Sequence, residues 1–98
     1  MILRTFIIEP IDVTTILVPE ECKPLYIMHD SRRNHFRLIC LVKGIELTKT
    51  LIIRSFNPYG EYEVADDLGT FLNYVKAFDF NYIFFWSILN DARTTEQL

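Results

Sequence analysis

Residues His35–Val42 have the sequence HFRLICLV, and this stretch gives the clearest indication of the fold. Over residues 38–42 every side chain is apolar, so both faces of an extended chain would be apolar there. A strand of this kind is typical of the middle of a sheet. Lys49–Phe56 shows the same pattern over residues 51–53. These two stretches therefore predict the centre of a β-sheet.

Shorter apolar runs on either side predict the remaining strands. We expect strands over Ile2–Ile8, Thr14–Val18, Leu25–His29 and Phe80–Leu89. The charged, proline-bounded segment Pro19–Pro24 is expected to be a loop, and Lys43–Thr48 a connection. Asn57-Pro58-Tyr59-Gly60 predicts a β-turn, because Pro stands at its second position and Gly at its fourth.

The segment Val64–Phe78 allows two interpretations. Apolar residues recur along it at helical spacing, and Asp66 and Asp67 would stabilise the N-terminus of a helix. Against a helix, Gly69-Thr70 would lie in its middle, and several of its residues are β-branched or aromatic. We favour a strand here and keep a helix near 64–78 as the alternative.

The composition favours an all-β protein. Ile, Val, Thr, Phe, Tyr and Trp together account for 39 of the 98 residues, whereas Ala occurs only three times. The chain length allows one domain, so we expect a single β-rich domain over 1–98 with a frayed tail at 91–98. The predicted architecture is a small antiparallel sandwich or partly closed barrel of six or seven strands, and the alternative is α+β.

Charge and apolar content narrow the class of partner. Ten basic and thirteen acidic residues give a formal net charge of −3, which argues against nonspecific binding to nucleic acid or anionic membranes. The longest apolar stretch is far shorter than the ~20 residues of a membrane-spanning helix. Only two cysteines are present, and no secretory signal is evident. We therefore expect a protein of the cytoplasm.

A basic segment, Asp30–Arg37, is the first candidate binding site. It has a net charge of +2, which leaves −5 for the rest of the chain. If residues 31–34 form a four-residue hairpin loop, Asp30 pairs with His35 and His29 with Phe36. The guanidinium group suits phosphates and carboxylates because it donates two parallel hydrogen bonds. The predicted binding residues of this hairpin tip are Arg32, Arg33, His35 and Arg37.

A second candidate site surrounds the predicted turn. Arg54 lies in an apolar strand, and Tyr59 and Tyr62 flank the turn. Arginine beside exposed aromatic rings can stack on planar groups or anchor a protein interface. Nearby, an acidic group could attract a metal or a basic partner; its members are Glu61, Glu63, Asp66 and Asp67.

The aromatic strand is the third candidate surface. Tyr82, Phe84 and Trp86 share one face and Phe85 lies on the other, so both faces need cover. We expect one face to be buried between subunits of a homo-oligomer, with Tyr82, Phe84 and Trp86 at the interface. We find no motif of a catalytic site, a cofactor site or a metal site, and predict no enzyme activity.

Several features together resemble a family of short phage-encoded proteins of unknown function. They are the Val18-Pro19 step, the stretches Leu25–His29 and Phe36–Val42, the Gly69-Thr70-Phe71 segment and the aromatic Phe84-Phe85-Trp86. The resemblance implies a small β-rich fold, a phage origin and a hairpin of Leu68–Ala77 with Asn81–Leu89.

By analogy with other small phage proteins, we expect a noncatalytic protein that inhibits a host component, above all a host defence system, by protein–protein contact. One alternative is an oligomer that sequesters a small phosphate-bearing signalling molecule. Another is a structural or accessory phage protein.

Overall fold

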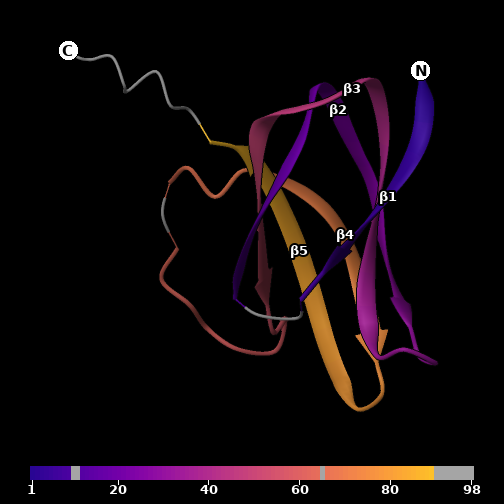
Figure 1. Cartoon of the computed structure of the whole chain (residues 1–98). Helices are drawn as coiled ribbons and strands as arrows, with labels where there is room; N and C mark the ends of the chain where they lie inside the picture. The colour runs from indigo at the N-terminus through magenta and orange to yellow at the C-terminus, as the bar shows by residue number, and fades with distance from the viewer. Residues whose placement is uncertain (10–11, 65, 90–98) are drawn as a thin grey trace.

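The structure is a computed structural model, and it describes residues 1–9, 12–64 and 66–89. Every regular element within these residues is a β-strand (Figure 1). The strands are β1 (Ile2–Ile8), β2 (Val13–Asp30), β3 (His35–Phe56), β4 (Thr70–Ala77) and β5 (Phe80–Ile88). The predicted all-β class is therefore confirmed. The predicted tail at 91–98 lies outside the described residues.

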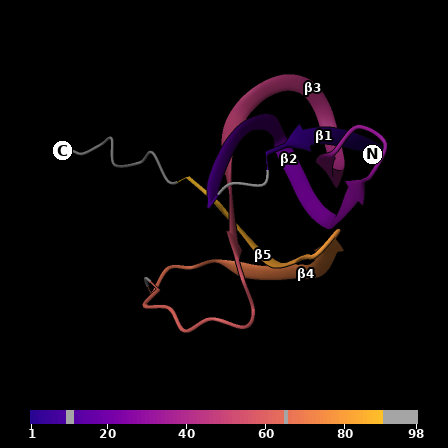
Figure 2. The ribbon, with the colours of Figure 1, turned by 90° about the horizontal axis from the view of Figure 1, so that it is seen from below.

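The strands form one antiparallel sheet that curls into a half-barrel (Figure 2). β3 is its centre: β2 pairs along one edge of β3, while β1 and β5 pair with the first and second halves of the other edge. β4 pairs with β5 only. The sandwich is not observed. No described segment forms a helix with the length and apolar character needed to cross a bilayer.

The described residues contain five strands rather than the predicted six or seven, because β2 and β3 each join two predicted strands. Pro19–Pro24 is not a loop but part of β2. Both prolines lie at irregularities of pairing, with register shifts at Val18/Pro19, Pro19/Glu21 and Pro24/Tyr26. A bulge leaves a residue out of the hydrogen-bond ladder, so it accommodates the missing N–H of proline.

The predicted connection Lys43–Thr48 is likewise the middle of β3. All of its residues are exposed, and Gly44 has a φ of 95° that residues with a side chain rarely adopt. The buried face changes across this arch: even-numbered residues point inward over 36–42, and odd-numbered residues do so over 51–55. The arch therefore lets both halves of β3 line the same core, as the curvature of β3 in Figure 2 indicates.

The alternative helix over 64–78 is wrong, because residues 70–77 form β4. Gly69 precedes β4 with a φ of 104°, and a Cβ atom there would collide with the carbonyl group of Trp86. β4 and β5 form the hairpin that the resemblance implied, with Ala77 opposite Phe80. The hairpin loop of β2 and β3 is also as predicted, since Asp30 pairs with His35 and His29 with Phe36.

The core lies inside the half-barrel and takes residues from every strand. Its members are Ile8, Val18, Ile27, Phe36, Leu38, Cys40, Val42, Leu51, Ile53, Val75, Ala77 and Phe84. The Asn73 side chain joins the β2 and β4 edges by two hydrogen bonds. Asn73 Nδ2 donates to the Ile27 carbonyl oxygen, Asn73 Oδ1 accepts from the Ile27 N–H, and both distances are 2.9 Å. We call this contact the Asn73 seam.

Candidate functional site

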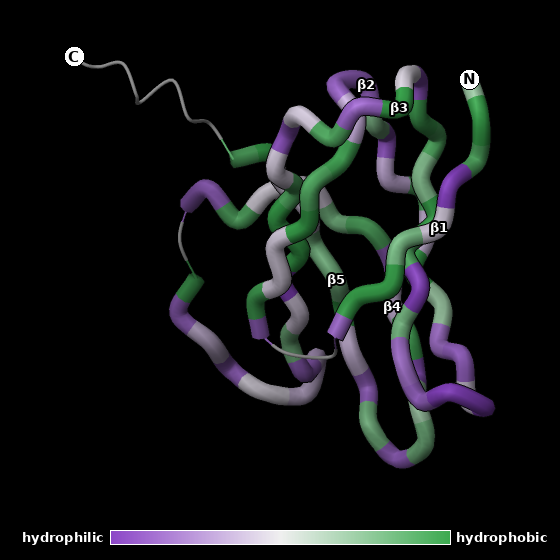
Figure 3. Tube along the Cα trace, in the orientation of Figure 1, coloured by the Kyte–Doolittle hydropathy of each residue, from purple (hydrophilic) through white to green (hydrophobic). Residues whose placement is uncertain are grey.

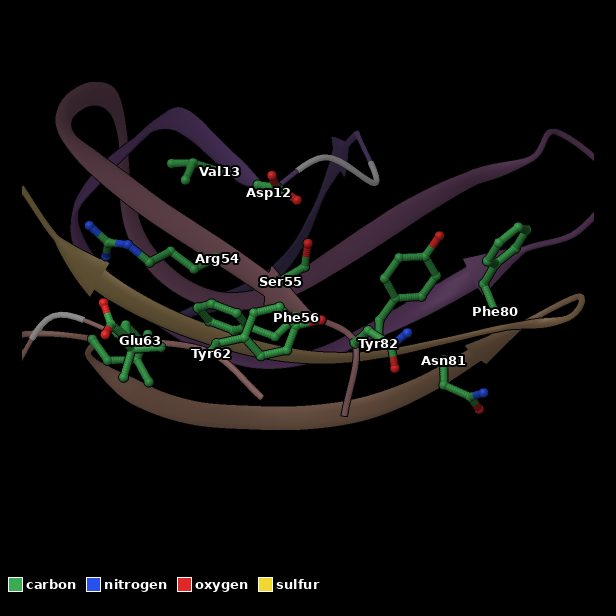
Figure 4. Close-up of a pocket in the computed structure, with 13 residues that line it drawn as sticks. Asp12, Val13, Arg54, Ser55, Phe56, Tyr62, Glu63, Phe80, Asn81 and Tyr82 are labelled. Carbon is green, nitrogen blue, oxygen red and sulfur yellow. The ribbon is translucent and has the colours of Figure 1, made fainter. Parts of the chain in front are cut away.

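A pocket of about 450 Å³ lies at the end of β3, where the chain leaves for the loop that leads to β4 (Figure 4). Four parts of the chain surround it: the end of β3, the start of β2, the start of β5 and the loop between β3 and β4. Its lining residues are Asp12, Val13, Arg54, Ser55, Phe56, Asn57, Tyr62, Glu63, Val64, Leu68, Phe80, Asn81 and Tyr82.

Strand alternation positions the residues of β3 at the pocket. Ser55 is buried on the core face, so Arg54 and Phe56 point to the outer face. The Ser55 N–H donates to the Asp12 carbonyl oxygen at 3.0 Å, which brings Asp12 beside the end of β3. Arg54 Nη1 donates to Ser87 Oγ at 3.3 Å and is thereby held against β5.

Aromatic rings form a continuous row from the pocket across the outer face of the sheet. The Tyr62 and Phe56 ring centroids are 5.5 Å apart, and Figure 4 shows the two rings side by side. Phe85 follows at 6.0 Å from Phe56, and Phe71 at 5.6 Å from Phe85. We call Tyr62, Phe56, Phe85 and Phe71 the aromatic row. It spans the loop, β3, β5 and β4.

The loop reaches the row through the turn at residues 57–60. The Gly60 N–H donates to the Asn57 carbonyl oxygen at 3.2 Å, as the turn prediction required. The Tyr62 ring folds back over Gly60, where an added Cβ would lie 2.8 Å from the Tyr62 hydroxyl oxygen. Without a side chain at residue 60, Tyr62 can pack beside Phe56.

Carboxylates outnumber cations around the pocket. Asp12 and Glu63 are lining residues, while Arg54 is the one basic lining residue among the described part of the chain. The loop adds Glu61, Asp66 and Asp67, which are all exposed. Two carboxylates and one guanidinium therefore line the pocket, and Phe56 and Tyr62 make part of its wall aromatic.

The structure brings together two of the three residues predicted for this site. Arg54 and Tyr62 both line the pocket, but Tyr59 does not. Tyr59 is exposed and lies near Tyr74 instead. Desolvation and the neighbouring Tyr59 hydroxyl raise the pKa of Tyr74. Asp12 was missed, since nothing in the sequence links it to Ser55. Phe56 could have been found from its i, i+2 spacing to Arg54.

The predicted hairpin-tip site is separate from the pocket, and the Asp30 carboxylate lies beside the side chains of two of its residues. Arg37 forms an ion pair with Asp30 at 3.3 Å, and His35 Nε2 lies 4.0 Å from the same carboxylate. Asp30 Oδ1 also accepts from the backbone N–H groups of Arg32 and Arg33 at 3.1 and 3.4 Å. The side chains of Arg32 and Arg33 are exposed.

These contacts also act on the Asp30 carboxyl. Partial desolvation raises its pKa, but the hydrogen bonds from the Arg33 and Arg32 backbone and from Arg37 outweigh it and lower the pKa. The ionised form of Asp30 is thus the one that fits this turn.

The predicted oligomer interface lies on the core face of β5. Phe84 is 1% exposed and belongs to the core of the chain itself. Its ring lies 5.4 Å from that of Phe36, and Tyr82 and Trp86 pack against the same core. One chain therefore covers Phe84 fully and Tyr82 and Trp86 in part. Phe85, on the other face, belongs to the aromatic row.

The two cysteines are neighbours, of which Cys40 is buried and Cys22 is half-buried. Burial raises the pKa of both Cys22 and Cys40, and their thiols interact with each other. In the described ranges no three His, Cys, Asp or Glu residues gather as they would around a metal ion. Comparison with known protein families, curated proteins and solved structures gave no match.

Proposed function

We propose that this protein is a noncatalytic binding protein that recognises another protein by holding one of its basic side chains in the pocket beside Arg54 and Tyr62. The observation that carries the proposal is the combination of an aromatic wall, Phe56 and Tyr62, with an acidic rim that includes Asp12 and Glu63. This combination suits a cation on an apolar stem.

The chemistry follows from the structure of Lys and Arg side chains. Their methylene stems cover apolar surface while the charged group stays in water or meets a carboxylate. An aromatic face also attracts a cation, by roughly 0.5–1 kcal/mol at an exposed site. Arg54 opposes an incoming cation, but it is turned to Ser87, and the two lining carboxylates, Asp12 and Glu63, exceed its single charge.

The surroundings of the pocket favour a protein over a free small molecule. The aromatic row continues beyond the pocket to Phe71, which is 54% exposed. Tyr and Arg are enriched among the residues that dominate protein interfaces, and they are usually surrounded by further contacts that exclude water. A partner that inserts a basic side chain would also lie across Phe85 and Phe71.

The biological part of the proposal rests on the sequence. From the resemblance to short phage-encoded proteins, the partner is a host protein of the cytoplasm, best sought first among defence systems, and binding blocks it. Neither catalysis nor a cofactor enters this proposal.

Nuclear magnetic resonance titration tests the proposal without knowledge of the partner. The ¹⁵N-labelled protein is titrated with acetyl-Gly-Arg-Gly-amide, acetyl-Gly-Lys-Gly-amide and acetyl-Gly-Glu-Gly-amide. We expect the two basic peptides to move the amide signals of Arg54, Phe56 and Glu63, with a Kd on the order of millimolar, and the acidic peptide to leave them in place.

Matched variants in one loop identify the group responsible. Glu63→Gln should weaken the response to the Arg peptide several-fold, because Glu63 lines the pocket. Asp67→Asn removes the same charge from the same loop outside the lining and should change it little. An equal response to the acidic peptide, or an equal loss in both variants, would overturn the proposal.

A further inference from the structure

β1 is an edge strand with only one of the features that normally prevent edge-to-edge pairing, the charge of Arg4. It pairs with β3 and with no other described strand. Its ladder runs from Ile2 to Ile8 without a register shift, and it contains no proline. Charges, prolines and bulges are the usual protection of edge strands. Arg4 is its single charged residue, as the mostly hydrophobic colouring of β1 in Figure 3 indicates.

The outer face beside this edge is mostly apolar, with Arg37 opposite Ile7 as its charged residue next to β1. Leu3, Thr5 and Ile7 point outward, because Phe6 and Ile8 pack into the core. Leu3 and Ile7 are 66% and 55% exposed. The outer face continues through Ile39 and Leu41 of β3 to Tyr26 and Met28 of β2. The exposed edge therefore adjoins a mostly apolar surface.

We propose that β1 pairs antiparallel with β1 of a second copy of this chain, related by a two-fold axis at Thr5. This register uses all seven residues of the strand. It places Thr5 opposite Thr5 of the second copy, Leu3 opposite Ile7, Ile2 opposite Ile8 and Arg4 opposite Phe6. The strand is thus nearly palindromic in chemical character about its central residue.

Faces and charges select this register over its neighbours. Directly opposite residues share a face, so a shift by one residue would place core-facing residues opposite outward-facing ones. A shift that moves the axis to Arg4 sets two arginines directly opposite each other, which is unfavourable. In the proposed register Arg4 faces a Phe6 ring. The same attraction exists within the chain, where the Arg4 guanidinium lies 5.2 Å from the Phe6 centroid.

The proposed dimer differs from the predicted one in location. The sequence placed the interface on Tyr82, Phe84 and Trp86, which belong to the core face of β5. Pairing through β1 leaves that face within each subunit. It joins two curled sheets edge to edge and satisfies the backbone groups that the β1 edge otherwise leaves to solvent.

Sedimentation velocity on three proteins tests this proposal and its register. The wild type should sediment as a dimer, twice the 11.6 kDa mass of one chain. The double variant Leu3→Lys with Ile7→Lys puts like charges opposite each other twice, so its dimer Kd should rise by at least about tenfold. The double variant Leu3→Lys with Ile7→Glu pairs opposite charges at the same positions and should restore the dimer.

Both double variants should fold, because the two replaced side chains are largely exposed, and circular dichroism verifies this. Tyr62→Ala, at the pocket, should leave the dimer unchanged. A wild type that is monomeric up to about 1 mM would overturn the proposal and leave the edge to a different partner. A dimer that is equally stable in both double variants would also overturn it.

Discussion

The Asn73 seam offers the sharpest test of how the half-barrel is held together. β2 and β4 are both sheet edges, and the Asn73 carboxamide meets both backbone groups of Ile27 at 2.9 Å. It does so from a bulge, because the β4 register shifts between Phe71 and Asn73. One side chain thus replaces a pair of backbone hydrogen bonds between two strands that form no ladder.

Asn73→Ala should destabilise the protein by about 2–3 kcal/mol. Each lost hydrogen bond contributes roughly 1 kcal/mol, and the partly buried N–H and carbonyl groups of Ile27 are left without their partner. For a domain of this size, roughly 5 °C of Tm corresponds to 1 kcal/mol, so the Tm should fall by about 10–15 °C. Thermal unfolding followed by circular dichroism measures this change.

Asn73→Asp adds a signature that depends on pH. The carboxylate can still accept from the Ile27 N–H, but it repels the Ile27 carbonyl oxygen, and only the protonated carboxyl can donate to it. Its folded pKa should therefore be raised. The loss of stability is full above that folded pKa and disappears as the pH falls below the unfolded value of about 3.9.

Asn57→Asp is the matched control for both effects. Asn57 Oδ1 accepts from the Tyr59 N–H at 2.9 Å, and an aspartate can keep this hydrogen bond. The control should stay within about 0.5 kcal/mol of the wild type at neutral pH. If Asn73→Ala lowers the Tm no more than Asn57→Asp, the side chain does not hold the two edges together and the reasoning fails.

Three further predictions concern the hairpin tip and the cysteines. The double variant Arg32→Glu with Arg33→Glu should change the Tm by less than about 5 °C, because exposed charges contribute under ~1 kcal/mol to stability. The same variant should abolish any salt-sensitive binding of inorganic phosphate. A large fall in Tm would show instead that these two side chains stabilise the fold. Asp30→Asn should lower the Tm at pH 7. Because the folded pKa of Asp30 is lowered, this deficit should begin to shrink as the pH falls below the ordinary value of 3.8 and should vanish only below the lowered folded pKa; a constant deficit would contradict the ion-pair account. Cys22 and Cys40 should react with iodoacetamide at pH 7.5 far more slowly in the native protein than in guanidinium, because burial raises the pKa of both thiols. Rapid alkylation of either thiol in the native protein would show that solvent reaches it.

The local sequence was sufficient to predict strand pairing where a short loop determines the register. Four residues between two apolar runs predicted that Asp30 pairs with His35, and every further pair near the hairpin loop follows from that one. Strand alternation also predicted that Phe84 and Phe85 lie on opposite faces of β5. These inferences needed only neighbours in the chain.

The local sequence led to a wrong prediction where pairing with a distant strand determines whether a segment is a loop or a strand. Pro19 and Pro24 bound a charged segment, and such a segment can be a loop or a bulged strand, because either one accommodates proline. The second half of β3 makes the difference, since it supplies a pairing partner for β2 across the arch. The pocket also depends on contacts between distant parts of the chain, because the hydrogen bond from the Ser55 N–H to the Asp12 carbonyl oxygen joins residues far apart in sequence.

The pattern of apolar residues on both faces of a strand had two separate causes here. In β5, one face is core, and the other is covered by rings of the same chain, since Phe85 contacts Phe56 and Phe71. In the first half of β3, the outer residues Ile39 and Leu41 have only the neighbouring strands beside them. We therefore place the proposed dimer interface at β1 and not at β5.

The two proposed surfaces can be occupied together. No residue that lines the pocket belongs to β1, and β1 pairs with residues 36–42 of β3, whereas the pocket lies at the other end of β3. A dimer through β1 would thus carry two pockets. A partner with two basic side chains at a matching distance would bind both, and the second contact would raise the overall affinity without any new interaction. The double variant Leu3→Lys with Ile7→Lys would then weaken binding to such a partner while leaving the millimolar response to a single Arg peptide unchanged.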